Sequence, residues 1–261
     1  MSDLQPLPAD ERPHPGVGET WWFDVAGEEW GAYAQLTFVP AERVAWWWAA
    51  VVGSSPALVM IRADDLRIPA RGMELRGDGV WACVTCETPL EHWSVGLECF
   101  GVSLDDPLQA WGDERGDLVP FGLDLEWEAR MGAVVVGDGA YEQWCAVSGE
   151  ILLGDDRIDV DAAGWRGRRW GRPVPEAGWR VGAGGWRASG DAWPGAAGGG
   201  GPSGVVTPWP GPAEIDGRRV VPVAWSPVLV PGWRVAHGLC RVEPGGWGWG
   251  AWSAPEGGGW P

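Results

Sequence analysis

The chain has 261 residues, of which 45% are apolar, and a formal net charge of −17, so it can build one large or two smaller globular β units. All 19 basic residues are arginine, which excludes a catalytic Schiff-base lysine and the lysine of a phosphate-binding loop. Residues 1–160 carry a net charge of −20 and residues 161–261 a net charge of +3. The acidic excess argues against nucleic acid or an anionic membrane as a partner.

The first sixteen residues and the cysteines bear on where the protein works. Residues 1–16 are acidic and proline-rich and lack the basic start and apolar run of a secretory signal. The longest uncharged stretch, residues 44–61, is interrupted by Gly53-Ser54-Ser55-Pro56, which predicts two strands and a turn rather than a membrane span. Five cysteines, an odd number, suit a reducing compartment. We therefore predict a cytoplasmic protein without an integral membrane segment.

Alternating strands and short turns recur along the first part of the chain. Residues 31–39 show the side-chain alternation of a β-strand, and residues 44–52 show it again. Pro40-Ala41-Glu42 between them is predicted to form a turn. Tight hairpin turns are then predicted where glycine and aspartate cluster, at Gly77-Asp78-Gly79, Gly137-Asp138-Gly139 and Gly154-Asp155-Asp156. The pattern is typical of an antiparallel β meander.

Helical signals are few, and the composition changes toward the C-terminus. Asp106, Pro107 and Gln109 are typical of the start of a helix, and Gly112 is typical of its end. This segment is therefore predicted to form one or two helical turns. From Gly164 onward glycine and proline increase, and residues 195–204 are predicted to be a loop. Further strands are expected within 205–209, 218–230, 233–242 and 247–252. We predict an all-β protein with an N-terminal domain over residues 1–163 and a smaller, less regular one over 164–261.

Tryptophan dominates the side-chain chemistry, with 23 residues in the chain. In the strand over residues 44–52, Trp46 and Trp48 share one face and Trp47 the other, so both faces are apolar and covered. Indole faces stabilise positive charge by up to about 2 kcal/mol when desolvated, which suits chemistry on isoprenoids through carbocations. The alternative is that most of these indoles simply fill a barrel.

A second candidate region follows the sequence Cys86-Glu87-Thr88-Pro89-Leu90-Glu91-His92-Trp93-Ser94. Counting by twos from His92 places Ser94, Gly96, Glu98 and Phe100 on one strand face. Glu98 there is either a buried acid with a raised pKa, able to protonate an alkene or enol, or part of a solvated face. The three histidines have no zinc-hydrolase spacing, so we predict neither a metal nor an organic cofactor.

Several segments together resemble one family. They are Glu19-Thr20-Trp21-Trp22-Phe23-Asp24, Val44-Ala45-Trp46-Trp47-Trp48, Thr85 to Ser94, Gly122-Leu123-Asp124-Leu125-Glu126-Trp127, Leu239-Cys240-Arg241 and Gly248-Trp249-Gly250-Ala251-Trp252. They resemble an uncharacterised bacterial branch related to the AttH-like and carotenoid 1,2-hydratase superfamily. The resemblance implies two lipocalin-like β-barrels packed together around a cavity for an apolar ligand, as in hydratases, cyclases and Diels–Alderases that work without cofactors.

The chain departs from that family at one motif. Where the family has Gly-Gln-Arg-Asp-His-Ser-Trp-Gly, this sequence reads Gly164-Trp165-Arg166-Gly167-Arg168-Arg169-Trp170-Gly171. Gly167 and Arg168 thus replace an aspartate and a histidine, and in the hydratase relatives that histidine belongs to the acid/base apparatus. Arginine cannot release its proton near neutral pH, so Arg168 is expected either to orient a polar group of the ligand or to mark a lost activity.

Two functions remain open from the sequence. The first is a cofactor-independent hydratase, isomerase or cyclase acting on a hydrophobic isoprenoid or polyketide-like molecule, with Glu98 and Arg168 as catalytic residues. Its substrate-binding residues would be Trp46, Trp48, His92, Trp93 and Trp170. The second is a non-catalytic protein of the same fold that binds a hydrophobic ligand. An interaction module using solvent-exposed indoles is a third interpretation.

Overall fold

The structure is a computed structural model that describes residues 6–53, 57–112, 114–171, 177–194 and 210–256. Strands dominate it, and the helical segments described are two short 3-10 turns, η1 (Pro8–Glu11) and η2 (Pro107–Trp111). None of the described helices is long and apolar enough to cross a membrane. The predicted all-β class is confirmed.

The first sheet contains eleven antiparallel strands. They are β1 (Glu19–Ala26), β2 (Gly31–Val39), β3 (Val44–Val52), β4 (Leu58–Arg67), β5 (Glu74–Gly77), β6 (Val80–Thr88), β7 (His92–Leu104), β8 (Asp117–Ala129), β9 (Val134–Gly137), β10 (Ala140–Leu153) and β11 (Asp156–Trp170). Their order is β4-β3-β2-β1-β11-β10-β8-β7-β6-β5, with β9 beside β10. Because the end of β7 also pairs with β4, at Leu58↔Leu104, the sheet closes into a barrel.

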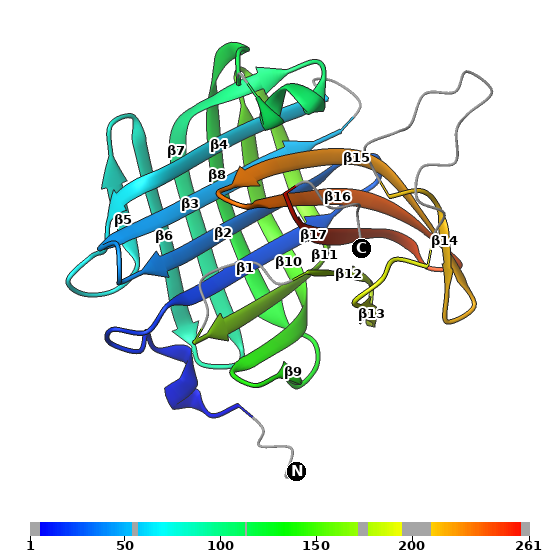
Figure 1. The fold of residues 1–261 in the computed structure, drawn as a ribbon, viewed down its shortest axis with the longest axis horizontal. Coiled ribbons are helices and arrows are strands. Elements are labelled where there is room, and N and C mark those ends of the chain that lie inside the picture. Colours follow the sequence, from blue (N-terminus) through cyan, green and yellow to red (C-terminus); the bar gives the residue numbers. More distant parts are fainter. Residues whose placement is uncertain (1–5, 54–56, 113, 172–176, 195–209, 257–261) are drawn as a thin grey trace.

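The second sheet contains six antiparallel strands in the order β13-β12-β17-β16-β15-β14. They are β12 (Gly178–Ala183), β13 (Trp186–Gly190), β14 (Ala213–Ile215), β15 (Arg218–Val230), β16 (Trp233–Glu243) and β17 (Gly246–Pro255). The sheet curls around its own apolar core, which includes Trp179, Trp225 and Trp252. Figure 1 shows β15, β16 and β17 crossing the outer face of the first barrel over β1, β2 and β3. Two barrel-like sheets packed together are thus the architecture.

The alternation in β3 explains how the two sheets are joined. Ala45, Trp47, Ala49 and Val51 face the interior of the first barrel. Trp48, Ala50 and Val52 point the other way, into a separate apolar cluster that also contains Val228 and Val235 of the second sheet. Both faces of this strand are therefore buried, as its composition predicts, since one face packs the barrel and the other packs the second sheet.

Local turn chemistry places the strand ends where the sequence predicts them. The three predicted glycine–aspartate turns join β5 to β6, β9 to β10 and β10 to β11. The predicted short helix is η2, where the Asp106 side chain accepts a hydrogen bond from the Leu108 amide at 3.0 Å. The predicted loop over residues 195–204 and the strand over 205–209 lie outside the described residues.

The chain changes sheets later than the composition indicates. β11 passes through the predicted boundary at residues 163 and 164 and stays in the first sheet as far as Trp170. Its glycines allow close approach of neighbouring groups: a Cβ on Gly164 would lie 1.9 Å from the Asp24 carbonyl, and one on Gly167 would lie 2.1 Å from the Trp22 ring. Gly164 and Gly167, where the glycine enrichment begins, therefore belong to strand packing.

Candidate functional site

The interior of the first barrel is filled by the chain's own aromatic side chains. Trp21, Phe23, Trp93 and Trp127 are almost fully buried there. The Phe23 ring lies 5.8 Å from the Trp93 ring and 5.2 Å from the Trp127 ring, measured between centroids. Trp93, predicted to bind substrate, is thus a core residue of the barrel.

One end of this barrel contains two buried arginines that are neutralised by the N-terminal segment. Arg166 donates from Nη2 to Glu11 Oε1 at 2.8 Å and to Gln143 Oε1 at 2.5 Å. Arg168 is fully buried, pairs with Glu19 and donates to the Arg12 carbonyl at 2.6 Å. Buried charges need such partners, and here the chain itself supplies the carboxylates.

Aromatic rings hold Arg168 from both sides. Its guanidinium carbon lies 4.8 Å from the Trp21 ring centroid and 5.5 Å from that of Trp170. Trp170 also lies 5.3 Å from the His14 ring and 6.2 Å from the Tyr141 ring. Arg168 and Trp170 therefore lie close together in a packed ion-pair network inside the first barrel.

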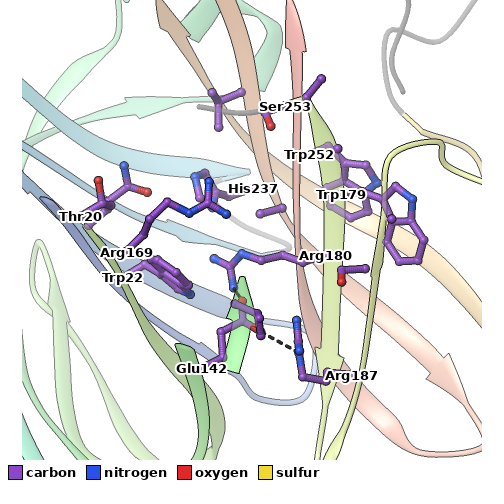
Figure 2. A pocket seen from close by; sticks show the side chains of 18 of the residues that line it. Thr20, Trp22, Glu142, Arg169, Trp179, Arg180, Arg187, His237, Trp252 and Ser253 are labelled. Carbon is purple, nitrogen blue, oxygen red and sulfur yellow. Dashed lines mark ion pairs between the residues drawn. The ribbon is translucent and has the colours of Figure 1, made fainter. Parts of the chain in front are cut away.

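A cavity of about 320 Å³ lies between the two sheets, at the lower end of the range of about 300–1,000 Å³ typical of small-molecule sites. Residues of β1, β2, β3, β10 and β11 form one side, and residues of β12, β13, β16 and β17 form the other. Four indoles line it, those of Trp22, Trp48, Trp179 and Trp252. Figure 2 labels three of them, Trp22, Trp179 and Trp252. The cavity therefore combines aromatic walls from both sheets.

Two arginines of the second sheet reach buried carboxylates of the first sheet at this cavity. Arg180 Nη1 on β12 lies 3.4 Å from Asp24 Oδ2 and 3.8 Å from Glu142 Oε1. Arg187 Nε on β13 lies 2.7 Å from Glu142 Oε2, the ion pair dashed in Figure 2. The guanidinium of Arg180 also covers the Trp22 ring, at 4.8 Å from its centroid. These contacts fix the second sheet against the first.

Asp24 is the most strongly perturbed acid of this group. It is buried on β1, and its Oδ1 accepts a hydrogen bond from the Trp165 amide at 2.9 Å. Burial raises the pKa of Asp24 to about 7, although the nearby Arg180 opposes that rise. A carboxyl group that exchanges its proton near neutral pH thus lies at the junction of the two sheets.

His237 lines the same cavity from β16 and is 3% exposed. Its ring is stacked on Tyr33 of β2, with a centroid distance of 4.0 Å and an interplanar angle of 12°. Burial, together with the positive charge of Arg180, lowers the pKa of His237 to about 3, so the imidazole is neutral. Neither ring nitrogen has a hydrogen-bond partner among the described residues.

Of the tryptophans predicted from the sequence to bind the substrate, Trp48 lines the cavity. Its Nε1 donates to Asp64 Oδ1 at 2.7 Å, which fixes the indole. The Trp46 ring is stacked on it, with a centroid distance of 5.7 Å and an interplanar angle of 12°. Trp46 does not line the cavity itself but packs behind Trp48.

Glu98 and His92 lie on the outer surface of the first barrel, away from the cavity. Glu98 on β7 is exposed, not the buried acid that one interpretation of the sequence required. His92 Nε2 lies 3.4 Å from Glu126 Oε2 of the neighbouring strand β8. The residues counted by twos from His92 do share a face, but that face is the outer one, because Trp93, Val95 and Leu97 fill the interior.

Sequence reasoning missed Asp24, Glu142, Arg180 and His237. Each comes from a different strand, so no local motif connects them. The available signal was a charged or imidazole side chain within an otherwise apolar run, as in residues 235–240 for His237. Among the described residues, no group of three or more His, Cys, Asp and Glu side chains could hold a metal ion.

Comparison with solved structures shows the same fold in other proteins. A candidate AttH protein of Nitrosomonas europaea is similar over 96% of this chain and 97% of its own, with 13% identity and a TM-score of 0.54. CghA in complex with Sch210972 matches over 92% of this chain and 89% of its own, with 11% identity and a TM-score of 0.49. The similarity to the AttH protein confirms the expected AttH-like fold.

Comparison of the sequence with protein families identifies one match. No curated protein matches the chain. The family model described as a domain of unknown function, DUF7064, matches residues 7–180, which is two thirds of the chain and includes the whole first barrel. The chain belongs to the DUF7064 family.

Proposed function

We propose that the protein binds an apolar small molecule in the cavity between its two sheets. The observation that carries the proposal is the cavity itself, about 320 Å³ in volume and lined by four indoles. Large aromatic side chains around a recess between two structural units are typical of small-molecule sites. Ten of the twenty described residues that line the cavity are polar or charged, so the ligand that suits it combines an apolar body with polar groups, as an oxygenated isoprenoid or a polyketide-like molecule does.

The proposed binding residues differ from most of those that the sequence indicated. Trp48 remains, with Trp46 as its stacking support. Trp22, Trp179 and Trp252 replace Trp93 and Trp170 as walls. Since adjacent residues of a strand point to opposite sides, β11 directs Arg168 into the first barrel and Arg169 toward the cavity.

A binding experiment with a matched control tests this proposal. Ser253 lines the cavity, whereas Ser148 is exposed on β10 outside it, so Ser253→Trp fills the cavity and Ser148→Trp does not. Nile red, which fluoresces strongly in apolar sites, should bind the wild type and Ser148→Trp equally and Ser253→Trp at least tenfold more weakly. Equal binding by all three proteins would contradict the proposal.

A second candidate function is a cofactor-independent isomerase acting on a bound ketone. The observation that favours it is that a buried carboxylate, Glu142, and a neutral imidazole, His237, line one cavity. A carboxylate base with a neutral imidazole as hydrogen-bond donor is an arrangement that supports enolisation. Glu142 would remove a proton from the carbon next to the carbonyl, His237 would donate a hydrogen bond to the enolate oxygen, and the proton would return to another carbon.

Hydrogen exchange would reveal such proton transfer on any enolisable ketone that the cavity accepts. In D₂O, the wild type should catalyse incorporation of deuterium next to the carbonyl of 2-acetylnaphthalene. Glu142→Gln should lose that catalysis, whereas the exposed Glu98→Gln should retain it. Exchange at the uncatalysed rate with the wild type would leave ligand binding as the function and remove the isomerase candidate.

A further inference from the structure

Three side chains that line the cavity carry buried nitrogens without a hydrogen-bond partner among the described residues: Trp22, Trp252 and His237. His237 is 3% exposed, and of the three it offers both a donor and an acceptor. A buried polar group without a partner is costly to the protein. The stacked Tyr33 ring holds the imidazole in place, and Figure 2 shows it among the side chains that line the cavity. A ligand oxygen that reaches this ring would supply the missing partner.

The imidazole offers one donor and one acceptor, and no charge. Burial and the positive charge of Arg180 both oppose protonation, which lowers the pKa of His237 to about 3. A neutral imidazole carries one N–H donor and one bare nitrogen acceptor. It is complementary to a carbonyl oxygen, which accepts, or to a hydroxyl group, which does both.

Two of the three arginines that line the cavity, Arg180 and Arg187, already pair with carboxylates of this chain. Arg180 lies 3.4 Å from Asp24 and 3.8 Å from Glu142, and Arg187 lies 2.7 Å from Glu142. A ligand carboxylate near these groups would meet Glu142, which is 4% exposed and lines the cavity, and would displace an existing ion pair. Among the described residues, the unpaired buried nitrogens of the lining belong to uncharged side chains, those of Trp22, Trp252 and His237.

We infer, building on the proposed binding function, that the cavity selects neutral oxygenated ligands, whose carbonyl or hydroxyl oxygen hydrogen-bonds to His237 while the apolar body contacts Trp48, Trp179 and Trp252. A hydrocarbon of the same size cannot form this hydrogen bond. A carboxylate would place a second negative charge beside Glu142 and disturb the existing ion pairs. His237 is thus the residue that determines specificity, and the indoles supply contact area of low selectivity.

Three probes that share a naphthalene skeleton separate the effect of the hydrogen bond from the effects of apolar contact and charge. 2-Acetylnaphthalene carries a carbonyl, 2-ethylnaphthalene carries a methylene in its place, and 2-naphthoate carries a carboxylate. Since one net hydrogen bond corresponds to about three- to tenfold in affinity, calorimetry on the wild type should show the ketone binding that much more tightly than the ethyl compound. 2-Naphthoate should bind more weakly than the ketone.

Two substitutions test the role of His237. His237→Phe keeps a ring that can stack on Tyr33, so it should bind 2-ethylnaphthalene as the wild type does but lose the preference for the ketone. His237→Gln retains a donor and an acceptor and should keep part of the preference. With ¹⁵N-labelled histidine in the wild type, the ring-nitrogen resonances of His237 should shift further with the ketone than with the ethyl compound, which tests the contact without any substitution.

The outcomes distinguish this inference from the proposed function on which it builds. Equal affinity of the wild type for the ketone and the ethyl compound, a preference that survives in His237→Phe, or tighter binding of 2-naphthoate would each overturn the selectivity while leaving the cavity as a binding site. Failure of the wild type to bind any of the three probes, or binding that Ser253→Trp does not weaken, would overturn both.

Discussion

Arg180 Nη1 of the second sheet lies 3.4 Å from Asp24 Oδ2 of the first sheet, at the edge of the cavity that the two sheets enclose. Through this contact and the pairing of Arg187 with Glu142, charged residues join two apolar surfaces. One carboxyl group of these contacts, that of Asp24, has a pKa raised by burial to about 7.

The first prediction concerns the pH dependence of stability at Asp24. Its folded-state pKa is raised from 3.8 to about 7, so between these pH values the folded protein retains a proton that the unfolded chain has released. The stabilising contribution of Asp24 is present below pH 3.8 and is lost as pH rises through about 7, by an amount of the order of 4 kcal/mol. In urea unfolding experiments, Asp24→Asn should therefore gain stability relative to the wild type as pH rises from 4 to 7.

The exposed Asp65 provides the control for that experiment. Asp65→Asn should follow the pH profile of the wild type, because substitutions at exposed positions usually change stability by less than about 0.5 kcal/mol. An Asp24→Asn curve that runs parallel to the wild type over this pH range would show that Asp24 ionises normally in the folded protein.

The second prediction concerns Arg168. Because Arg168 is fully buried and paired with Glu19, Arg168→Met leaves the buried Glu19 carboxylate with His14 but without its arginine, and should cost about 3–5 kcal/mol of unfolding free energy. Adding Glu19→Gln should recover part of that loss, since it removes the buried negative charge. Nile red affinity of the folded protein should stay within about twofold of the wild type. Loss of affinity without loss of stability would instead assign Arg168 to the ligand.

The third prediction compares two buried tryptophans. Trp48→Phe shortens a wall of the cavity and removes the hydrogen bond to Asp64, so the affinity for 2-acetylnaphthalene should fall several-fold. Trp93→Phe, inside the first barrel, should lower the unfolding free energy by about 1–3 kcal/mol and leave the affinity unchanged. A reversed pattern, with affinity lost in Trp93→Phe, would place the ligand inside the first barrel.

The fourth prediction is a null result at Glu98. Its side chain is exposed on the outer face of β7, and surface substitutions of this kind usually change stability by less than about 0.5 kcal/mol. Glu98→Gln should therefore unfold at the same urea concentration as the wild type and bind the same probes. Any clear loss of binding would indicate a second site on the barrel surface.

The fold was predictable because its signals are local. Glycine–aspartate turns fix the hairpins, and alternation within strands such as β3 separates the barrel interior from the face that receives the second sheet. Asp106 and Pro107 start η2 for the same reason. What alternation does not reveal is which face points inward, and for this reason Glu98 could be interpreted either as a buried acid or as a solvated one.

The site was predictable only in part because it forms where two sheets meet. Trp48 was recognisable from a strand that is apolar on both faces. Asp24, Glu142, Arg180 and His237 come together only when the second sheet packs on the first, and Asp24 and His237 are 213 positions apart in the chain. The family-like motif around Arg168 pointed instead to a strand whose inward residues stabilise the first barrel.

The most direct test of the proposed site is a crystal structure of the protein soaked with 2-acetyl-6-bromonaphthalene, in which the anomalous signal of bromine marks the ligand. The proposal predicts one bromine peak between the two sheets, among Trp48, Trp179 and Trp252, with the ketone oxygen within hydrogen-bonding distance of His237. A peak inside the first barrel, or on the protein surface only, would contradict it.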